Sequence, residues 1–567
     1  MKICSIFLFL AVAVHSCSQK TASTLPAQEM KSDGPRLVVL LSVDQMRYDF
    51  FTRFEDLFEG GLKKVYEEGL VYSNAHHVHS FTGTAPGHAT LATGNYPSNH
   101  GIIENDFYDP ELGRMVYCVA DPAAVPVGLY DPQGPGVSPR NLEKPTLGDR
   151  LKNDKKRSKV FGVSFKDRSS VLMTGSKADQ AFWFDLATTA FVSSNYYMRE
   201  FPKWTEPFLG KERYKEEIAE GWHKKFDDSV YERARQDDFL FENGRFLPSF
   251  PHTKERMASF IRSDWKDGLM LYLTPLGDKF TLEFSKELIE KESLGKDPIV
   301  DYLAVGCSMA DAIGHHFGPY SQEVLDYYLR LDEYLGDFID YLDEEIGRDN
   351  YLLVFTSDHG VLPMPEYLAE KEGIDAKRIQ VAPFQEAMYA ADASMRTELG
   401  LSDTVFFMSS AQGVNLRYQE ASQKGIAPEK LREAAKKALE AIDFVEAAYS
   451  EEDVKKEPTD GEDEYLDFYR NSYFPGRGHD IKIRFKKHYL VGYPPTGTTH
   501  GSPYEYDSRV PLIFFGKQFK HGVYDRRIET VDVAPTIAEI LNLKTSGMDG
   551  TPLKEVVKNM EERTSIE

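Results

Sequence analysis

The stretch RLVVLLSVD, residues 36–44, is a largely apolar run that ends in an aspartate. Runs of this kind are typical of strands that are buried on both faces of a parallel sheet. Four further runs have the same character and predict further strands. They are KVFGVSF at 159–165, PIVDYLAVGCS at 298–308, NYLLVFTSD at 350–358 and VPLIFFG at 510–516.

Amphipathic helical patterns separate these runs, as in residues 54–69 and 321–347. Strands that alternate with helices predict an α/β fold with a doubly wound, mostly parallel sheet and helices on both faces. We expect one large domain over residues 35–567, interrupted by two insertions at about 175–298 and 362–485. The aromatic-rich part of the first insertion, residues 182–204, is either a surface for a leaving group or a β-rich packing layer.

The composition indicates a globular protein and argues against nucleic acid as a partner. Of the 567 residues, 41% are hydrophobic and 13% are aromatic, which is ample for a packed core. The formal net charge is -23, whereas sequence-independent binding of nucleic acid requires basic patches that displace counterions from phosphates. Any anionic substrate must therefore meet positive charge that is supplied locally.

The N-terminal segment MKICSIFLFLAVAVHSCSQK predicts export, with residues 1–16 as a signal peptide and residues 17–34 as a polar tether. The residues before Cys17 resemble a bacterial lipoprotein cleavage box, so we expect a lipidated Cys17 and membrane attachment; plain signal-peptide cleavage is the alternative. The expected location is the periplasm or the outer membrane. Outside this segment only Cys118 and Cys307 remain, so no disulfide framework is expected.

Several aspartates and histidines stand where parallel strands end, which is where ligands bind in open α/β sheets. An aspartate there is often only the cap of the next helix, but three in one chain favour a metal site. Mixed carboxylate and imidazole ligands suit zinc better than calcium or magnesium. The candidates are Asp44, Asp311, His315, Asp358, His359 and His500, whereas His76, His77 and His79 are expected to be structural or surface groups, His88 to support a turn and His316 to point away.

The stretch HSFTGTAPGHATLATG, residues 79–94, places hydroxyl residues just ahead of a predicted helix start at Pro86. Thr84 falls at or near the N-cap, where free backbone N–H groups favour negative charge. One interpretation is that Thr84 only caps the helix. The other is that Thr84 is a nucleophile, which requires a base or a metal to lower the pKa of its hydroxyl.

These motifs together resemble the alkaline phosphatase superfamily, and within it the PafA-like, phosphate-irrepressible bacterial alkaline phosphatases, which are related to nucleotide pyrophosphatase/phosphodiesterases. The resemblance runs from about residue 35 to the C-terminus. The motifs that carry it, in family order, are SVDQMRYD, TAPGHATLATGNYPSNHGIIEND, SFKDRSS, DAIGHHFGP, TSDHG, HGSPYEYDSRVPLIFFG, DVAPTIAEILNL and GMDGTPL.

The resemblance implies a secreted enzyme that hydrolyses phosphate monoesters at a two-zinc site through a phosphothreonine on Thr84. Asn105 would donate a hydrogen bond to a phosphoryl oxygen, and Lys166 and Arg168 would form the basic pair of the PafA-like branch. The sequence matches the family pattern at all these positions. The implied ligands are Asp311, His315 and His500 for one zinc, and Asp44, Asp358 and His359, with Thr84, for the other.

Charge balance favours a monoester over a diester. Three aspartates and a threonine alkoxide roughly neutralise two zinc ions, so Lys166 and Arg168 add positive charge that suits a dianion. In an extended backbone these two side chains project from one face, with Asp167 on the other; a solvated charged turn is the alternative. We expect small-molecule phosphate monoesters as substrates and a monomeric protein.

Two other functions remain as rivals. A phosphodiesterase or nucleotide pyrophosphatase would use the same ligands and the same threonine. A non-enzymatic binding lipoprotein would keep the fold and the metals without turnover. A sulfatase is disfavoured, because TAPGH has neither the residue that becomes formylglycine nor the arginine of a CxPxR-type motif.

Overall fold

The structure is a computed structural model, and it describes residues 34–128, 136–242, 244–246, 248–459, 461 and 463–564. The predicted signal peptide, Cys17 and nearly all of the predicted tether lie outside the described residues.

The centre of the molecule is a sheet of eleven strands, in which five neighbouring strands run parallel. Residue Leu40 in the middle of β1 pairs with Val354 on one side and with Ala304 on the other. Every residue of β1 is buried, because helices cover both faces of the sheet. In sheet order the parallel strands are β10 (Tyr351–Thr356), β1 (Leu37–Val43), β9 (Asp301–Cys307), β6 (Val160–Ser164) and β7 (Gln180–Asp185).

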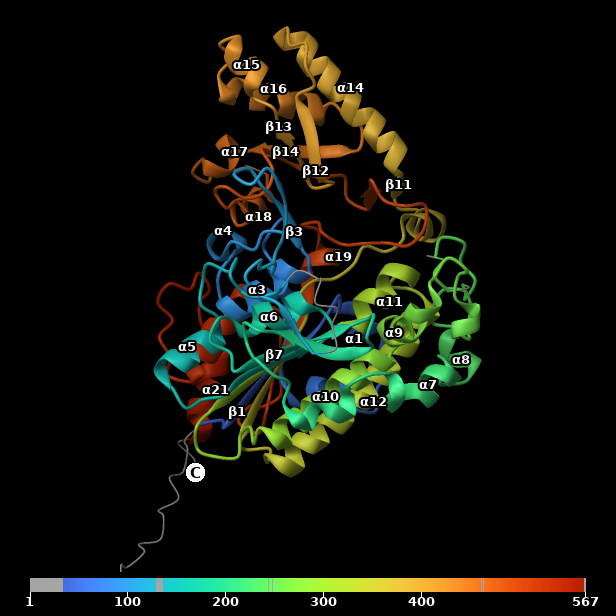
Figure 1. Cartoon of the computed structure of the whole chain (residues 1–567), viewed down its shortest axis with the longest axis vertical. Helices are drawn as coiled ribbons and strands as arrows, with labels where there is room; N and C mark the ends of the chain where they lie inside the picture. The colour runs from blue at the N-terminus through green and yellow to red at the C-terminus, as the bar shows by residue number, and fades with distance from the viewer. Residues whose placement is uncertain are drawn as a thin grey trace, which may run out of the picture.

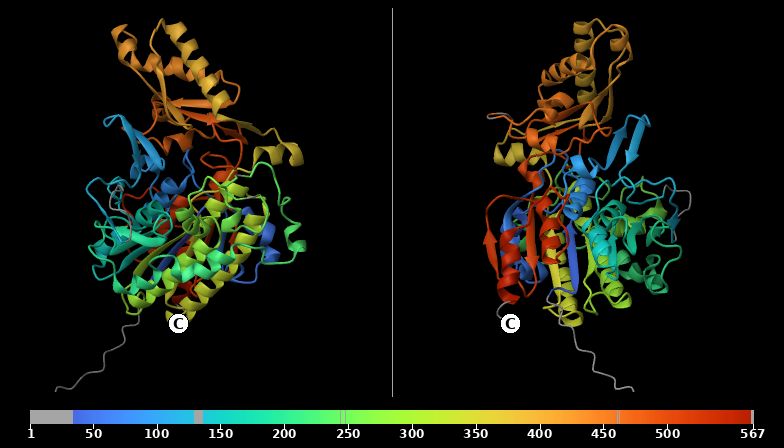
Figure 2. Two further views of the ribbon diagram at one scale, coloured as in Figure 1. Left: turned by 45° about the vertical axis from the view of Figure 1, so that its right-hand side comes forward. Right: turned by 90° about the vertical axis from the view of Figure 1, so that its left-hand side faces the viewer.

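Alternate residues of β1 enter two different cores, as the period of two in a strand requires. Val39 and Leu41 join the core with Leu335 of helix α12. Val38 and Leu40 join the opposite core with Ile537 of α20 (Val533–Ile540). Figures 1 and 2 show the resulting layers, and they confirm the predicted doubly wound fold. The first layer includes α2 (Gly61–Glu68), α10 (Leu276–Lys291) and α12 (Gln322–Glu345), and the second includes α5 (Leu147–Asp154) and α21 (Lys554–Thr564).

One predicted strand runs in the direction opposite to that expected. The run VPLIFFG forms most of β17 (Arg509–Phe515), which is buried as predicted but pairs antiparallel with β10 and with β2 (Leu70–His76). A continuous apolar run reports burial on both faces and carries no information on strand direction. The sheet stays mostly parallel, with this antiparallel strand at one side of the parallel core.

Much of the first predicted insertion, residues 175–298, packs into the main body. Strands β7 and β8 (Ala190–Ser194) extend the central sheet by antiparallel pairing. Phe182 and Phe191 are fully buried, with ring centroids 5.1 and 4.3 Å from that of Phe284 in α10. The interpretation as a packing layer therefore holds for these aromatic rings.

The second predicted insertion, residues 362–485, contains a small lobe with its own core. Figure 1 shows this lobe above the central sheet, on the side of helices α3 (Thr84–Thr93) and α11 (Met309–Phe317). Strands β12 to β15 form its four-stranded sheet, and two long helices cover that sheet. The elements are β12 (Phe406–Ser410), β13 (Gly413–Leu416), β14 (Val445–Ser450), β15 (Ile481–Phe485), α14 (Val381–Leu399) and α16 (Pro428–Glu440).

Cys118 and Cys307 are free and buried, as expected for a chain without a disulfide framework. Within the described part of the chain, no helix combines the length and the apolar character that crossing a bilayer requires.

Candidate active site

Three neighbouring parallel strands deliver the acidic groups of the site. Asp44 directly follows β1, Asp358 follows β10 by one intervening residue, and Asp311 lies in the first turn of α11 (Met309–Phe317), just after β9. The carboxyl ends of parallel neighbours meet at one edge of a sheet, so these three side chains come together there. Together with three histidines they form two groups, and within each group the ligand atoms all lie within 4.8 Å of one another. The groups are Asp311, His315 and His500, and Asp44, Asp358 and His359.

The first group is centred on the Asp311 carboxylate. His315 Nε2 lies 3.1 Å from Asp311 Oδ1, one helical turn further along α11. His500 Nε2 lies 3.5 Å from the same oxygen and comes from the loop ahead of α19 (Glu505–Ser508). Asp311 and His500, which are almost 190 positions apart in the chain, thus lie side by side in the first group.

The second group is completely buried. His359 Nε2 lies 3.3 Å from Asp44 Oδ1 and 3.4 Å from Asp358 Oδ2. The His359 ring stacks on the ring of His500 at a centroid distance of 3.6 Å. The two groups therefore adjoin each other and form one bipartite cluster.

The backbone fixes the orientation of each ligand imidazole. In all three histidines Nδ1 lies within 2.9 Å of a backbone carbonyl oxygen, so Nδ1–H donates to it and the Nε2 lone pair faces the carboxylates. Metal-binding histidines are held in the same way in other proteins. The pairs are His315 with Thr498, His359 with Gly360, and His500 with Thr82.

The donor set fits a divalent metal ion. Asp44 Oδ1, Asp358 Oδ2 and His359 Nε2 are buried atoms without a hydrogen-bond partner, and they all point into the second group. Unpartnered buried polar atoms are costly, so their convergence indicates a cation as the missing partner. Mixed nitrogen and oxygen donors are the ligands that zinc takes in catalytic sites.

The local charges shift the pKa values of this cluster. Burial and the nearby Asp44 carboxylate raise the pKa of Asp358 well above its usual range. Burial opposes a charge on His359, yet the Asp358 and Asp44 carboxylates raise the pKa of its imidazole to about 9. Burial and His359 lower the pKa of His500 to about 3, so His500 remains a neutral ligand. The raised pKa values of Asp358 and His359 show that the carboxylates of the second group favour positive charge beside them.

Thr84 is the first residue of α3 (Thr84–Thr93), and its hydroxyl does not cap the helix. The N-cap is Gly83, so Thr84 lies next to the N-cap as predicted, and no side chain makes a capping hydrogen bond there. Instead, Thr84 Oγ1 lies 3.4 Å from Lys166 Nζ and 3.4 Å from Arg168 Nη2. The interpretation of Thr84 as a mere cap is therefore wrong.

In the sequence analysis, Lys166 and Arg168 were considered on an extended backbone. In the structure the pair instead reaches Thr84 from the start of a helix. Lys166 is the N-cap of α6 (Asp167–Thr174), and Arg168 lies in the first turn of that helix. The Lys166 ammonium donates to Asp44 Oδ2 and to Asp311 Oδ2, each at 2.6 Å. Because the Lys166 side chain is only 3% exposed, these two carboxylates are the counterions that its charge requires.

Asn105 stands beside the start of α3. Its Oδ1 accepts a hydrogen bond of 2.9 Å from the backbone N–H of Ala85, the residue that follows Thr84 in the first turn of the helix. The sequence did not single out Tyr117, whose hydroxyl lies 3.4 Å from Arg168 Nη1 and donates to Asp167. A tyrosine of this kind carries no sequence pattern that marks it.

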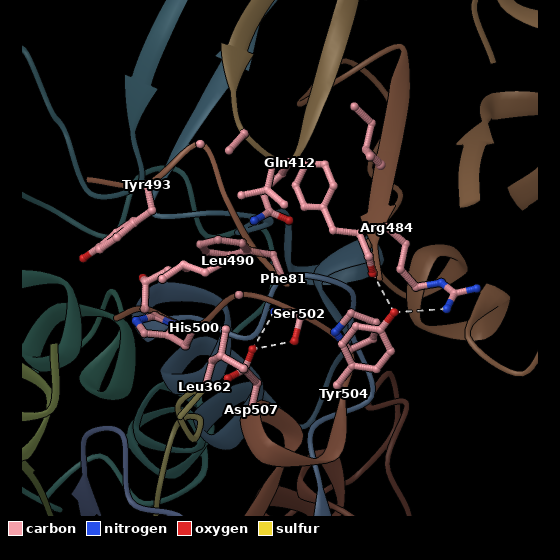
Figure 3. A pocket seen from close by; sticks show the side chains of 18 of the residues that line it. Phe81, Leu362, Gln412, Arg484, Leu490, Tyr493, His500, Ser502, Tyr504 and Asp507 are labelled. Atoms are coloured by element: carbon pink, nitrogen blue, oxygen red, sulfur yellow. Dashed lines mark hydrogen bonds between the residues drawn. The ribbon is translucent and has the colours of Figure 1, made fainter. Parts of the chain in front are cut away.

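A cavity of about 460 Å³ opens onto this cluster between the main body and the small lobe (Figure 3). His315, His500 and Asn105 lie in its wall on the side of the main body. Gln412 and Arg484 of the small lobe line it from the other side. A substrate can therefore contact the cluster at one end and the lobe at the other.

The five other histidines that the sequence analysis considered belong to neither ligand group. His88 Nδ1 lies 2.8 Å from the Thr84 carbonyl oxygen, and His316 Nδ1 lies 2.7 Å from that of Ala312. His76, His77 and His79 are buried and hydrogen-bonded, so they are structural groups and not surface groups.

Comparison with known proteins identifies the family of this chain. The sequence profile described as type I phosphodiesterase / nucleotide pyrophosphatase matches residues 38–502. The chain belongs to this family. Alkaline phosphatase PafA from Elizabethkingia meningoseptica is 34% identical over 545 residues, which cover 92% of this chain and 94% of that protein.

Two further comparisons extend the likeness to nearly the whole chain. Alkaline phosphatase PhoV from Synechococcus elongatus is 32% identical over 568 residues, covering 97% of this chain and 99% of that protein. The crystal structure of wild-type PafA matches with a TM-score of 0.83 at 32% identity, covering 92% of this chain and 99% of that one. The predicted PafA-like family, fold and enzyme class are confirmed.

Proposed function

We propose that this protein is an alkaline phosphatase that hydrolyses phosphate monoesters at a two-zinc site through a phosphothreonine on Thr84. One observation supports this most directly: Lys166 Nζ contacts a carboxylate of each ligand group and lies 3.4 Å from Thr84 Oγ1. A single atom thus links both groups to the proposed nucleophile. The names and structures of the relatives agree with this activity.

The two groups of ligands would each hold one zinc ion. When bound, the ions would supply Lewis acidity, which lowers the pKa of a hydroxyl or of water and neutralises charge on phosphoryl oxygens. The ligands are Asp311, His315 and His500 for one ion, and Asp44, Asp358 and His359 for the other.

The residues of the chain then divide the chemistry among them. Thr84 Oγ1 attacks phosphorus in line, the ester oxygen leaves, and water releases phosphate from Thr84 in a second in-line step. The Arg168 guanidinium, 3.4 Å from Thr84 Oγ1, grips phosphoryl oxygens as a fork. Asn105 donates from its amide, and Lys166 adds a second positive charge. Two cations beside the nucleophile favour a dianionic monoester over a monoanionic diester.

A comparison of two substrates with two variants tests this proposal. The wild type should cleave an aryl phosphate monoester far faster than its methyl diester. Thr84→Ala should lower monoester hydrolysis by about three orders of magnitude or more, as loss of a nucleophile does elsewhere. Thr397→Ala, which alters an exposed threonine in α14, is the matched control and should leave the rate unchanged.

Each component of the proposal has an outcome that contradicts it. Unchanged hydrolysis by Thr84→Ala would show that Thr84 is not the nucleophile. A preference for the diester would favour the phosphodiesterase alternative, and a wild type without turnover would favour a binding protein. Metal analysis should find about two zinc ions per chain, and a chelator should abolish activity reversibly.

We further propose that the protein is a monomer that is exported and anchored through a lipidated Cys17. The sequence of residues 1–34 supports the export and the anchor. A membrane anchor on a tether would leave the catalytic domain free in the periplasm.

A further inference from the structure

Gln45, directly after the ligand Asp44, has an unusual backbone conformation. Its φ is 67°, in the left-handed region that glycine adopts readily and that residues with a Cβ rarely adopt. Residues other than glycine in this region often lie at functional sites, where the surrounding structure holds them. Within the described residues, the other non-glycine residues with positive φ are Thr189, Ser293, His488 and Asn542.

The hydrogen bonds of Gln45 reach both ligand groups. Its backbone N–H donates to Asp358 Oδ1 at 3.1 Å, in the second group. Its side-chain Nε2 donates to Asp311 Oδ1 at 2.7 Å, in the first group. The residue is 2% exposed, so both hydrogen bonds are shielded from water. One residue therefore bridges the two carboxylates from opposite ends.

The facing helix leaves space for this side chain. Gly314 lies in α11 between Asp311 and His315, and a Cβ built on it would lie 1.8 Å from Gln45 Oε1. A side chain at this position would displace the Gln45 amide from the place where it contacts Asp311. The left-handed turn at Gln45 and the missing side chain at Gly314 thus serve the same contact.

We propose that Gln45 is a positioning residue that couples the two metal sites, because it holds the Asp311 and Asp358 carboxylates in fixed relative orientation. This inference rests on the proposed function. The Lys166 ammonium also bridges two carboxylates, but it is a charged group that can change partners when metal binds. Gln45 is neutral and donates to both carboxylates in the absence of metal, so it can preorganise both sites for metal.

Two variants separate the side chain from the backbone. Gln45→Met keeps the approximate size and the Cβ but removes the donor to Asp311. Gln45→Gly also removes the donor, yet it relieves the left-handed backbone and retains the N–H that faces Asp358. Asn542→Gly, at another left-handed residue that is far from the ligands, is the matched control for relief of backbone strain.

The measurement is the rate of zinc loss to a colorimetric chelator, with the thermal midpoint of the metal-free protein recorded in parallel. Both Gln45 variants should lose zinc about 10- to 100-fold faster than wild type, as loss of outer-shell partners does elsewhere. The metal-free Gln45→Gly protein should nevertheless unfold at or above the wild-type temperature. Asn542→Gly should retain zinc like the wild type.

Two results would overturn the role of Gln45. One is zinc loss at the wild-type rate in both variants. The other is fast zinc loss only in a variant whose metal-free form is destabilised, because that pattern indicates a purely structural role. A wild-type protein that binds no zinc would instead contradict the proposed function, so the two failures are distinguishable.

Discussion

Removal of the Lys166 ammonium should destabilise the metal-free protein much more than the metal-loaded protein. The Lys166 side chain is 3% exposed and donates to Asp44 Oδ2 and Asp311 Oδ2 at 2.6 Å each. Burial alone would raise the pKa of Asp44, but the Lys166 ammonium reverses that shift and holds this pKa below its usual range. Lys166→Met would leave both carboxylates without this counterion.

The expected magnitude follows from the cost of leaving buried charge without a partner. In the metal-free protein, Lys166→Met should lower the free energy of unfolding by about 3–5 kcal/mol. With zinc bound, the metal neutralises the same carboxylates, and the loss should fall below about 1 kcal/mol. Loss of one preorganised cation should also reduce kcat/KM for a monoester by about 30- to 1,000-fold, which corresponds to roughly 2–4 kcal/mol. The diester should suffer less.

Urea unfolding with zinc and with chelator, together with kinetics on both substrates, measures these effects. Lys152→Met is the matched control, because it removes a part-buried lysine from its pair with Asp179 in the main body. This variant should change neither the difference in stability between the zinc-bound and zinc-free protein nor the preference for the monoester over the diester. An equal loss of stability with and without zinc would refute the assigned role of Lys166 as the counterion of both ligand groups. A change that is equal for monoester and diester would refute its role in specificity.

The remaining predictions concern pH and location. His359 has a pKa raised to about 9 in the metal-free protein, so its charge stabilises the fold below pH 6.5, and this stability is lost as pH rises through about 9. Metal must displace that proton, so zinc affinity should increase with pH up to about 9 and binding should release protons into unbuffered solution; a pH-independent affinity would contradict this. Cys17→Ser should move the protein from the membrane fraction to the soluble periplasmic fraction, and an unchanged distribution would exclude lipidation at Cys17.

The ligands could be predicted from the sequence because their positions depend on local chain geometry. An aspartate that closes a buried parallel strand must lie at the carboxyl edge of the sheet, wherever the strand lies in the order. Asp44 and Asp358 are placed in this way, and Asp311 follows within the next turn of helix. The resemblance to the family then grouped these residues into two sets, and the same two sets come together in the structure.

The features that the sequence did not reveal depend on contacts between distant segments. The Lys166 ammonium meets Asp44 and Asp311 at separations of 122 and 145 residues. The left-handed backbone conformation of Gln45 could not be predicted from the residue type, because glutamine does not favour this region. The antiparallel direction of β17 is likewise set by chain connections and not by its apolar pattern.

The chemistry and the cavity wall come from different parts of the fold. Five of the six candidate ligands, Thr84 and the basic pair lie on loops and helix starts at the edge of the central sheet, and His315 lies in the last turn of α11. Gln412 and Arg484, which line the far side of the cavity, belong to the small lobe with its separate core. Since the ligand histidines are oriented by backbone carbonyls of the main body, substitutions on the lobe side change the cavity wall and leave these hydrogen bonds in place. The ligand cluster and the small lobe thus contribute different parts of the wall of one cavity.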